Sequence, residues 1–526
     1  MGSFAASYPF AFDPFQIEAL DALARGESVL VAAPTGSGKT VVGEFAVWLA
    51  LQEGRKAFYT TPLKALSNQK FGDFIALHGA SRVGLLTGDN SINAQAPVVI
   101  MTTEVLRNMI YEHSELLTDL RYVILDEVHY LQDPYRGAVW EEVIIHLPRD
   151  VVIVSLSATV SNAEEFAGWI QGLRGTTTAV IEERRPIRLE LHYLVEGELL
   201  PMFVSSDGGL TPNPEVRRLE SRRLSLQRRP GRGAPSGRAR APRRGHRARV
   251  ARTEVVETLA AADMLPAIYF IFSRRGCSAA VAQCMREGLV LTDATERARI
   301  RELAEMRCSY LGDEDLEVLG YQEWVEALAC GIAAHHAGQI PVFKETVEEL
   351  FKAGAVKLVF ATETLSLGIN MPARSVVIES LSKFTGERHE VLTPGEFTQL
   401  TGRAGRRGID TLGHAVVLQQ TDLPFTQIAG LASTRTYSLV SSFEPSYNMA
   451  TNLVRNYRWE EAEHLLNSSF AQYRVDKEVV MLEGRIEQNE AYLASYQKKM
   501  ACHLGDFEEY WRLKERLMRL ERSLAR

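Results

Sequence analysis

The sequence is poor in cysteine and has none of the cysteine pairs that hold structural metals. Its 526 residues include five cysteines, with no C-x-x-C spacing among them. This scatter argues against a structural zinc site or a disulfide framework, and it favours free thiols in a reducing compartment. No apolar run reaches the roughly 18 residues of a membrane-spanning helix, and the first residues lack a basic segment followed by an apolar one. We expect a cytoplasmic protein that binds no membrane.

The chain as a whole has no strong excess of either charge, but one segment of it is strongly basic. The formal net charge is −7. Residues 217–252 nevertheless contain fourteen arginines and one glutamate, a local charge of +13 that leaves −20 for the rest. This block has no aromatic residue, and glycine, proline and serine surround it, so we predict that residues 196–252 are disordered. Two roles stay open, a solvated tether between domains and a non-specific contact to phosphate backbones.

A glycine-rich loop follows an apolar run at residues 29–31 and opens into a helical pattern. Strand, loop and helix N-terminus in this order form a phosphate cradle. The glycines let backbone N–H groups point at phosphate oxygens, Lys39 supplies positive charge, and the Thr40 hydroxyl can ligate Mg²⁺. We therefore expect a bound nucleotide with Mg²⁺. The loop residues expected to bind it are Ala33, Pro34, Thr35, Gly36, Ser37, Gly38, Lys39 and Thr40.

Apolar runs alternate with helical patterns up to residue 195, which predicts an α/β fold with a parallel sheet covered on both faces. Reactive residues of such sheets lie on loops after the strands. Asp126 and Glu127 follow one run, where Asp126 can hold Mg²⁺ and Glu127 can polarise the attacking water. Ser157 and Thr159 follow the next one. The runs are 57–59, 83–86, 98–101, 122–125, 151–154 and 179–181.

A second α/β pattern begins near residue 253 and contains no second phosphate loop. Its apolar runs are 267–272, 331–333, 356–360, 375–378 and 414–418. Its most distinctive stretch carries Gln399, Arg403 and Arg406 among four glycines. On a helix these three positions share one face, so both arginines can point at a nucleotide held by the first domain.

The pattern becomes mainly helical after about residue 425. Residues 440–475 predict a small helical module. Two later runs keep a 4-3 apolar spacing on either side of a turn at 502–506, which predicts an antiparallel helical hairpin. The repeat is still running at Arg526, so we expect a hairpin that is cut short.

Four of these stretches together resemble motifs I, II, III and VI of the superfamily-two helicases: 33–40, 126–129, 157–159 and 399–408. Three more stretches narrow the resemblance to the Ski-two-like, DEVH-box RNA helicases: 60–70, 334–338 and 360–372. The resemblance runs from about residue 8 to 526 and is interrupted only by the arginine block.

This resemblance implies two tandem RecA-like domains, a winged-helix module and a helical stalk that begins an arch. The expected bounds are 1–195, 253–428, 429–475 and 476–526, with 196–252 as a disordered Arg-rich linker or insertion. The family continues into a ratchet domain, and this sequence ends before one. The implied function is that of an ATP-dependent helicase that uses ATP and Mg²⁺ and moves 3′→5′ on single-stranded RNA rather than DNA. The resemblance also implies a monomer, with RNA-decay partners that bind the stalk. Two alternatives stay open, a DNA helicase and a non-processive ATP-gated clamp.

The resemblance also implies residue roles. Gln16 would read adenine, although a solvated helix residue is an equal alternative. Arg403 and Arg406 would act as arginine fingers beside Gln399, while Ser157 and Thr159 would couple hydrolysis to domain closure. His335 and His336 belong to a family motif, but a histidine pair is more often structural, and we assign them no role. The implied nucleic-acid contacts are Pro62, Lys64, Gly88, Thr102, Thr103, Thr362 and Thr364.

Overall fold

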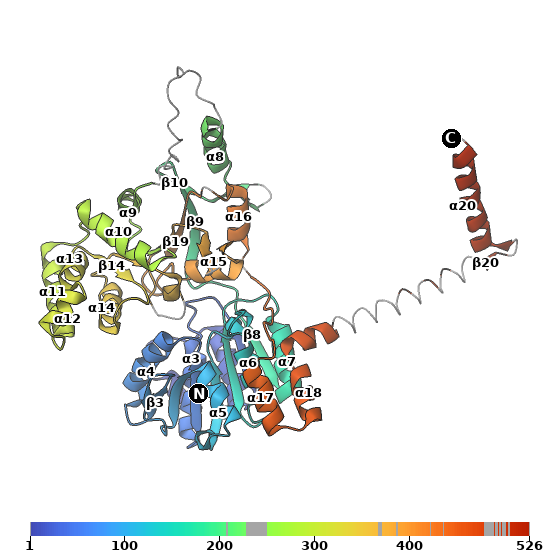
Figure 1. Ribbon diagram of the computed structural model, residues 1–526, viewed down its shortest axis with the longest axis horizontal. Helices are drawn as coiled ribbons and strands as arrows, with labels where there is room; N and C mark the ends of the chain where they lie inside the picture. The colour runs from blue at the N-terminus through green and yellow to red at the C-terminus, as the bar shows by residue number, and fades with distance from the viewer. Residues whose placement is uncertain are drawn as a thin grey trace. The chain divides into compact units, whose positions relative to one another are not determined.

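The computed structural model separates the chain into two compact units, Met1–Val440 and Ser441–Arg526 (Figure 1). Each unit is described by itself. The residues that the structure describes are 2–206, 209–227, 250–366, 371–384, 388–420, 422–434, 436–477, 489, 493, 496, 501–502 and 505–524.

The first unit begins with an eight-stranded sheet in the order β4-β3-β5-β2-β6-β7-β1-β8. All neighbours are parallel except β3 and β4. Every strand predicted before residue 195 is present, which confirms the parallel α/β fold. The bounds are β1 Ser28–Ala32, β2 Lys56–Thr61, β3 Val83–Leu86, β4 Ser91–Ile92, β5 Val98–Thr102, β6 Leu120–Leu125, β7 Val152–Ser157 and β8 Thr177–Ile181.

Helices cover this sheet, whose central strands are mainly apolar and buried along their whole length. β1, β5 and β7 are buried at every residue, so both faces must be shielded from water. One core joins α2, α3 and α4 to the sheet through Phe15, Phe45 and Phe74. The helices are α1 Gly2–Ala5, α2 Pro14–Ala24, α3 Thr40–Gln52, α4 Lys64–His78, α5 Thr103–Tyr111, α6 Ala138–His146 and α7 Ala163–Arg174, with 3₁₀ turns η1 Glu115–Leu117 and η2 Val128–Gln132.

A second sheet in the same unit has the order β10-β9-β19-β16-β13-β15-β14. β9 (Arg188–Val195) pairs in parallel with β19 (Leu412–Leu418). The predicted end of the first domain at residue 195 is therefore wrong, because this strand belongs to the second sheet. No strand was predicted at 188–195, and a local pattern would not have shown which of the two sheets it joins. The other strands are β10 Glu198–Pro201, β13 Ala267–Phe270, β14 Ile332–His335, β15 Leu358–Ala361 and β16 Ser375–Ile378.

The prediction of disorder over 196–252 is wrong for the described part of that segment. It contains β10, the hairpin β11 (Phe203–Ser206) and β12 (Gly209–Pro212), and α8 (Pro214–Gln227). These elements form because Met202 and Val216 are fully buried in the second core. Residues 228–249, which carry most of the arginines, lie outside the described residues. Since β9 precedes this segment and β13 follows it in one sheet, the segment is an insertion within the second domain, which is one of the two forms predicted for it.

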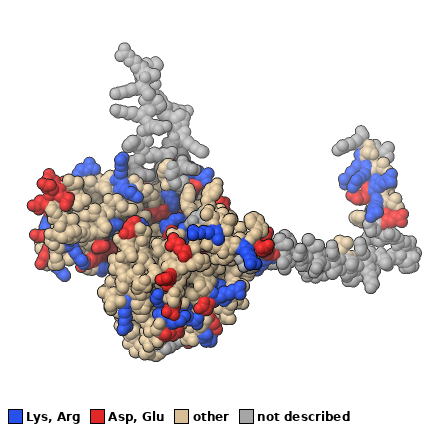
Figure 2. All heavy atoms as spheres, turned by 60° about the horizontal axis from the view of Figure 1, so that its bottom comes forward, with Lys and Arg blue, Asp and Glu red and all other residues tan. Residues whose placement is uncertain are grey.

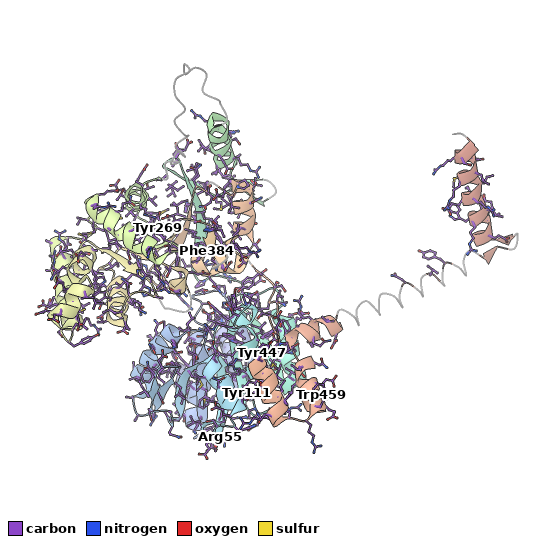
Figure 3. The ribbon with its side chains drawn as sticks, in the orientation of Figure 1. Arg55, Tyr111, Tyr269, Phe384, Tyr447 and Trp459 are labelled. Carbon is purple, nitrogen blue, oxygen red and sulfur yellow. The ribbon has the colours of Figure 1, made fainter. Side chains whose placement is uncertain are left out.

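A pair of aromatic rings packs in the core of the second sheet. The ring of Tyr269, labelled in Figure 3, has its centre 5.1 Å from that of Phe360 on the neighbouring strand, and the two rings are tilted by 54°. The surrounding elements are α9 Arg252–Ala261, α10 Arg274–Arg286, α11 Ala294–Cys308, α12 Asp313–Val318, α13 Tyr321–Ala329, α14 Pro341–Lys352, η3 Glu363–Ser366, β17 Ser382–Phe384, β18 His389–Val391, α15 Pro394–Thr401 and α16 Phe425–Ser433.

The second unit is helical where it is described, apart from one short hairpin. α17 (Tyr447–Asn456) and α18 (Trp459–Asn467) pack through Met449, Leu453 and Ala462. The predicted start of this module at 429 is wrong, since α16 belongs to the first unit. The winged-helix identity stays a prediction.

The stalk is described mainly by its last helix, α20 (Phe507–Leu524). β20 (Ala501–Cys502) and β21 (Gly505–Asp506) pair antiparallel, which confirms the predicted turn. Of the preceding apolar run, residues 489, 493 and 496 alone are described, and the rest lies outside the described residues.

Gly413 should be intolerant of a side chain. A Cβ there would lie 2.7 Å from the backbone carbon of Ala404, whereas a Cβ at Gly430, in α16, would meet nothing within 4 Å. Gly413→Ala should lower the free energy of unfolding by about 1–3 kcal/mol, because the backbone must shift. Gly430→Ala should be neutral or slightly stabilising. Thermal unfolding of the two variants checks this, and equal melting temperatures would contradict it.

His192, on β9, should make the second domain sensitive to acid. Burial lowers the pKa of His192 to about 4, and its Nε2 lies 3.1 Å from Nδ1 of His414 on β19. Below about pH 6.5 His192 binds a proton in the unfolded chain but stays neutral in the folded chain. The free energy of unfolding should therefore fall as the pH drops from about 6.5 toward 4. His192→Gln should flatten this dependence in denaturation series at several pH values. A slope unchanged by the substitution would exclude His192 as its source.

Candidate functional site

The glycine-rich loop lies between β1 and α3 and has the predicted turns. Gly36 and Gly38 have φ of +82° and +89°, which side chains rarely allow. Lys39 Nζ donates to the carbonyls of Ala33 at 2.7 Å and Pro34 at 3.1 Å. The Ser37 hydroxyl is buried without a partner among the described residues. A triphosphate would offer acceptors to both donors, so the loop fits the predicted ligand.

Gln16 is fully buried, so the alternative of a solvated helix residue is wrong. Its amide nitrogen donates to the Gly38 carbonyl at 2.9 Å, and its amide oxygen accepts from the Asp13 N–H at 2.8 Å. Gln16 thus holds the phosphate loop. Its reading of adenine stays a prediction.

Asp126 and Glu127 follow β6 directly, as predicted. Tyr59, on β2, donates its hydroxyl to Asp126 Oδ2 at 2.8 Å. Burial, and then the charge of Glu127, raises the pKa of Asp126, while Lys70 lowers that pKa more than Lys39 does. Glu127 has φ +53°, an uncommon left-handed conformation for a residue other than glycine. Such conformations gather at functional sites because the surrounding structure must hold them.

His129 joins three of the predicted stretches. The Ala158 N–H donates to His129 Nδ1 at 3.3 Å, and the Gln399 side-chain amide lies 2.6 Å from His129 Nε2. Burial lowers the pKa of His129 to about 3, so the ring is neutral. The Ser157 hydroxyl is buried without a partner among the described residues, and Thr159 is also buried. Gln399 therefore reaches the first domain through a histidine that sequence reasoning did not assign.

The prediction that Arg403 and Arg406 share a helix face is wrong, because α15 ends at Thr401. Arg403 is buried, and burial lowers its pKa while the charge of Glu127 opposes that shift. Arg406 Nε and Nη2 instead donate to Asp410 at 2.8 and 2.9 Å. Arg403 thus lies in the field of Glu127, whereas Arg406 is held by Asp410.

Arg407, which sequence reasoning also missed, makes the direct contact to the phosphate loop. Its Nη1 donates to the Ser37 carbonyl at 2.8 Å, and its Nη2 pairs with Asp13 at 2.7 Å. Nearby, a Cβ at Gly402 would lie 3.1 Å from the Thr35 side chain. Glycine at 402 therefore allows the two domains to approach closely at this loop.

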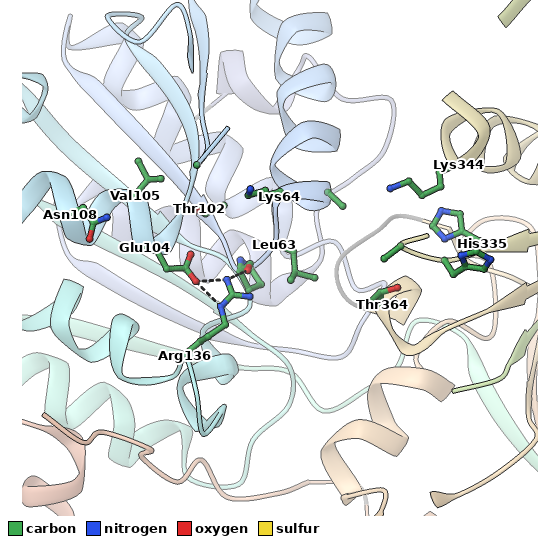
Figure 4. A pocket seen from close by; sticks show the side chains of 15 residues that line it. Leu63, Lys64, Thr102, Glu104, Val105, Asn108, Arg136, His335, Lys344 and Thr364 are labelled. Carbon is green, nitrogen blue, oxygen red and sulfur yellow. Dashed lines mark hydrogen bonds and ion pairs between the residues drawn. The ribbon is translucent and has the colours of Figure 1, made fainter. Parts of the chain in front are cut away.

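The predicted nucleic-acid residues converge on one cavity of about 610 Å³ between the two sheets (Figure 4). Figure 4 shows Lys64 and Thr102 on one side and Thr364, His335 and Lys344 facing them. Two of the predicted residues do not line the cavity themselves. Thr103 is buried, and the Thr362 hydroxyl lies 2.9 Å from the hydroxyl of Thr364, which does line the cavity. The predicted residues that line it are Pro62, Lys64, Gly88, Thr102 and Thr364.

Sequence reasoning missed the ion pair on the wall of this cavity. Arg136 Nε donates to Glu104 at 2.7 Å, and its Nη2 donates to the Pro62 carbonyl at 2.6 Å (Figure 4). His335 contacts Glu348 at 2.9 Å, which supports a structural role. Outside the cavity, basic and acidic side chains are interspersed on the face seen in Figure 2.

Comparison with known families gives two matches. Residues 13–166 match the DEAD/DEAH box helicase family, and residues 314–408 match the helicase conserved C-terminal domain. The first match contains the phosphate loop and the 126–129 box, and the second ends with the 399–408 block. No helix of the described residues is long and apolar enough to cross a membrane.

Three curated relatives illustrate the likeness. The chain is 55% identical to probable helicase HelY of Mycobacterium tuberculosis, covering 98% of this chain and 57% of that protein. It is 36% identical to ATP-dependent RNA helicase mtr4 of Schizosaccharomyces pombe, covering 98% and 46%. It is 35% identical to antiviral helicase SKI2 of Saccharomyces cerevisiae, covering 97% and 43%.

The chain thus spans about half the length of the curated relatives that it matches. Within that span the likeness includes both helicase domains and all four of the motif stretches. The chain therefore carries the DEAD/DEAH box helicase domain and the helicase conserved C-terminal domain, and over the span that it shares with them it is homologous to the Ski2-like DExH-box helicases.

Proposed function

We propose that this chain is the motor region of a helicase that hydrolyses ATP to move 3′→5′ along RNA, in RNA processing or decay. One observation carries the proposal. The phosphate loop and the predicted strand-binding cavity each combine residues of both domains of the first unit. A change at one site that alters the domain arrangement must then alter the other.

The roles at the ATP site follow from chemistry and position. The loop amides and Lys39 would hold the triphosphate, and Thr40 and Asp126 would hold Mg²⁺, which supplies charge neutralisation at the phosphates when bound. Glu127 would orient and polarise the attacking water. Arg403 would stabilise charge that develops in the transition state.

Coupling would pass through His129 and the 157–159 segment. The neutral His129 ring touches Ala158 and Gln399, which belong to different domains. Domain closure can therefore reposition the loop that carries Glu127. In the predicted strand-binding cavity, hydroxyls and backbone groups around Thr102 and Thr364 would hold phosphates without reading bases.

RNA is favoured over DNA as the substrate because one of the relatives above is named an ATP-dependent RNA helicase. A DNA helicase remains the alternative. The contacts between the domains include polar ones, such as Gln399 with His129 and Arg407 with the Ser37 carbonyl, which can break and form again as the domains open and close. The alternative class, a non-processive clamp, would bind nucleic acid in an ATP-dependent way without displacing a strand.

The stalk would bind RNA-decay partners.

Strand displacement on matched RNA and DNA duplexes tests the proposal. We expect ATP-dependent displacement of RNA duplexes with a 3′ single-stranded tail, and none with a 5′ tail. Glu127→Gln should retain binding of ATP and RNA but lose turnover by about 10²-fold or more, since water activation is lost while Asp126 remains. Displacement of DNA alone would identify a DNA helicase, and binding without displacement would identify a clamp.

Replacement of Arg403 should affect turnover, whereas replacement of Arg406 should affect stability. Arg403→Ala should lower kcat about 10²-fold with little change in ATP binding, because the guanidinium acts mainly on the transition state. Arg406→Ala removes the partner of Asp410, so it should lower the melting temperature and leave kcat within about threefold of the unmodified chain. The reverse pattern would show that the second domain turns to bring Arg406 to the nucleotide.

A further inference from the structure

Two histidines and a glutamate meet on neighbouring strands of the second sheet, and none of the three is assigned to ATP or to the nucleic acid. β9 and β19 lie side by side in parallel, with Glu190 opposite His414 and His192 opposite Val416 (Figure 1). Since side chains alternate along a strand, Glu190 and His192 lie on one face of the sheet. One possible ligand atom of each of the three residues lies within 4.8 Å of the other two. We call Glu190, His192 and His414 the β9–β19 cluster.

The distances within the β9–β19 cluster suit a zinc ion. Zinc binds an imidazole nitrogen at about 2.0–2.1 Å, so two nitrogens of a tetrahedral site lie about 3.3 Å apart. His192 Nε2 lies 3.1 Å from His414 Nδ1 and 3.8 Å from Glu190 Oε2. The Glu190 side chain is 37% exposed, so it has room to move toward the two rings. Small rotations would therefore place all three atoms around one ion, with water as a fourth ligand.

Charges around the cluster leave room for a cation. Arg188 lies 3.7 Å from Glu190, but its side chain is 79% exposed, so water screens its charge. Arg374 lies near His414, and its guanidinium pairs with Asp263 at 2.7 Å. The Glu190 carboxylate supplies negative charge at the point where a divalent ion would lie.

We propose that Glu190, His192 and His414 form a zinc site that joins β9 to β19. The alternative is a hydrogen bond between the two rings, in which an N–H of one ring donates to a nitrogen of the other. Such a bond accounts for the histidines but not for the carboxylate beside them, since 3.8 Å is too long for a hydrogen bond. Zinc accounts for all three residues. Its binding needs both facing nitrogens without a proton, so the shared proton would move to the other nitrogen of its own ring.

This site would fasten together two parts of the sheet that are far apart in the chain. β9 precedes the insertion, and β19 is the last strand of the sheet in chain order. The scattered cysteines argue against zinc held by cysteine, but histidines 222 positions apart leave no spacing motif in the sequence. An ion that binds the folded chain and not the unfolded one stabilises the fold by mass action. The acid sensitivity predicted for His192 then belongs to the chain freed of metal with EDTA.

The test uses the full chain, treated with EDTA and then dialysed, in calorimetric titration with ZnCl₂ and in thermal unfolding with and without zinc. We expect one zinc ion per chain and a melting temperature raised by about 3 °C or more at a large excess of zinc over Kd. His414→Gln should weaken zinc binding by about 10²-fold and Glu190→Gln by about tenfold, because an amide replaces a zinc ligand. Co²⁺ in place of zinc should give visible d–d bands without the charge-transfer band of thiolate ligands.

His389→Gln is the matched control, since His389 is an exposed histidine on β18 in the same unit. Its zinc affinity and its rise in melting temperature should equal those of the unmodified chain. If His414→Gln does not fold, Glu190→Gln, at a partly exposed position, decides the outcome. A melting temperature of the unmodified chain that zinc leaves unchanged would leave the hydrogen bond between the rings as the explanation and overturn the inference. Undiminished zinc binding in the folded cluster variants would overturn it too, because the metal would then lie elsewhere.

Discussion

Two adjacent carboxylates at the end of a buried strand require compensation, and the candidate ATP site is organised around that requirement. An ionised carboxylate is costly to bury unless cations and hydrogen bonds surround it. Asp126 receives a hydroxyl from β2 and positive charge from the phosphate loop and α4. Glu127 acts on Arg403 of the second domain. The same need for charge thus brings together side chains from distant parts of the sequence.

The two domains of the first unit meet at this site through small, specific polar contacts. A glutamine touches a histidine, an arginine reaches a backbone carbonyl, and a glycine leaves room for a threonine. Polar contacts of this kind orient the two domains relative to one another, and no large apolar surface has to be exposed to water when they break. An interface built in this way can open and close at low cost, which is what repeated turnover demands.

The sequence was sufficient for most strands of both sheets, though not for β4, β9 and β10, and for the phosphate loop and the acidic pair. Apolar periodicity and glycine turns are local, so they can be read without knowledge of the partner. The sheet that β9 joins, the contact of Gln399 with His129 and the contact of Arg407 with the loop depend on tertiary structure. The helix end at Thr401 did have a signal, because Gly402 follows it, and that glycine contradicted the shared face assumed for Arg403 and Arg406.

The position of β9 has a consequence for the covalent chain. This strand enters the second sheet ahead of residues 228–249, whereas β13, β14, β15, β16 and β19 all follow them. A single break within 228–249 would leave the N-terminal fragment attached to the C-terminal one through the parallel pairing of β9 with β19 and the burial of Met202 and Val216. Two separately produced fragments divided there would then be expected to reassemble, because each carries part of the same sheet and neither can bury its apolar face alone.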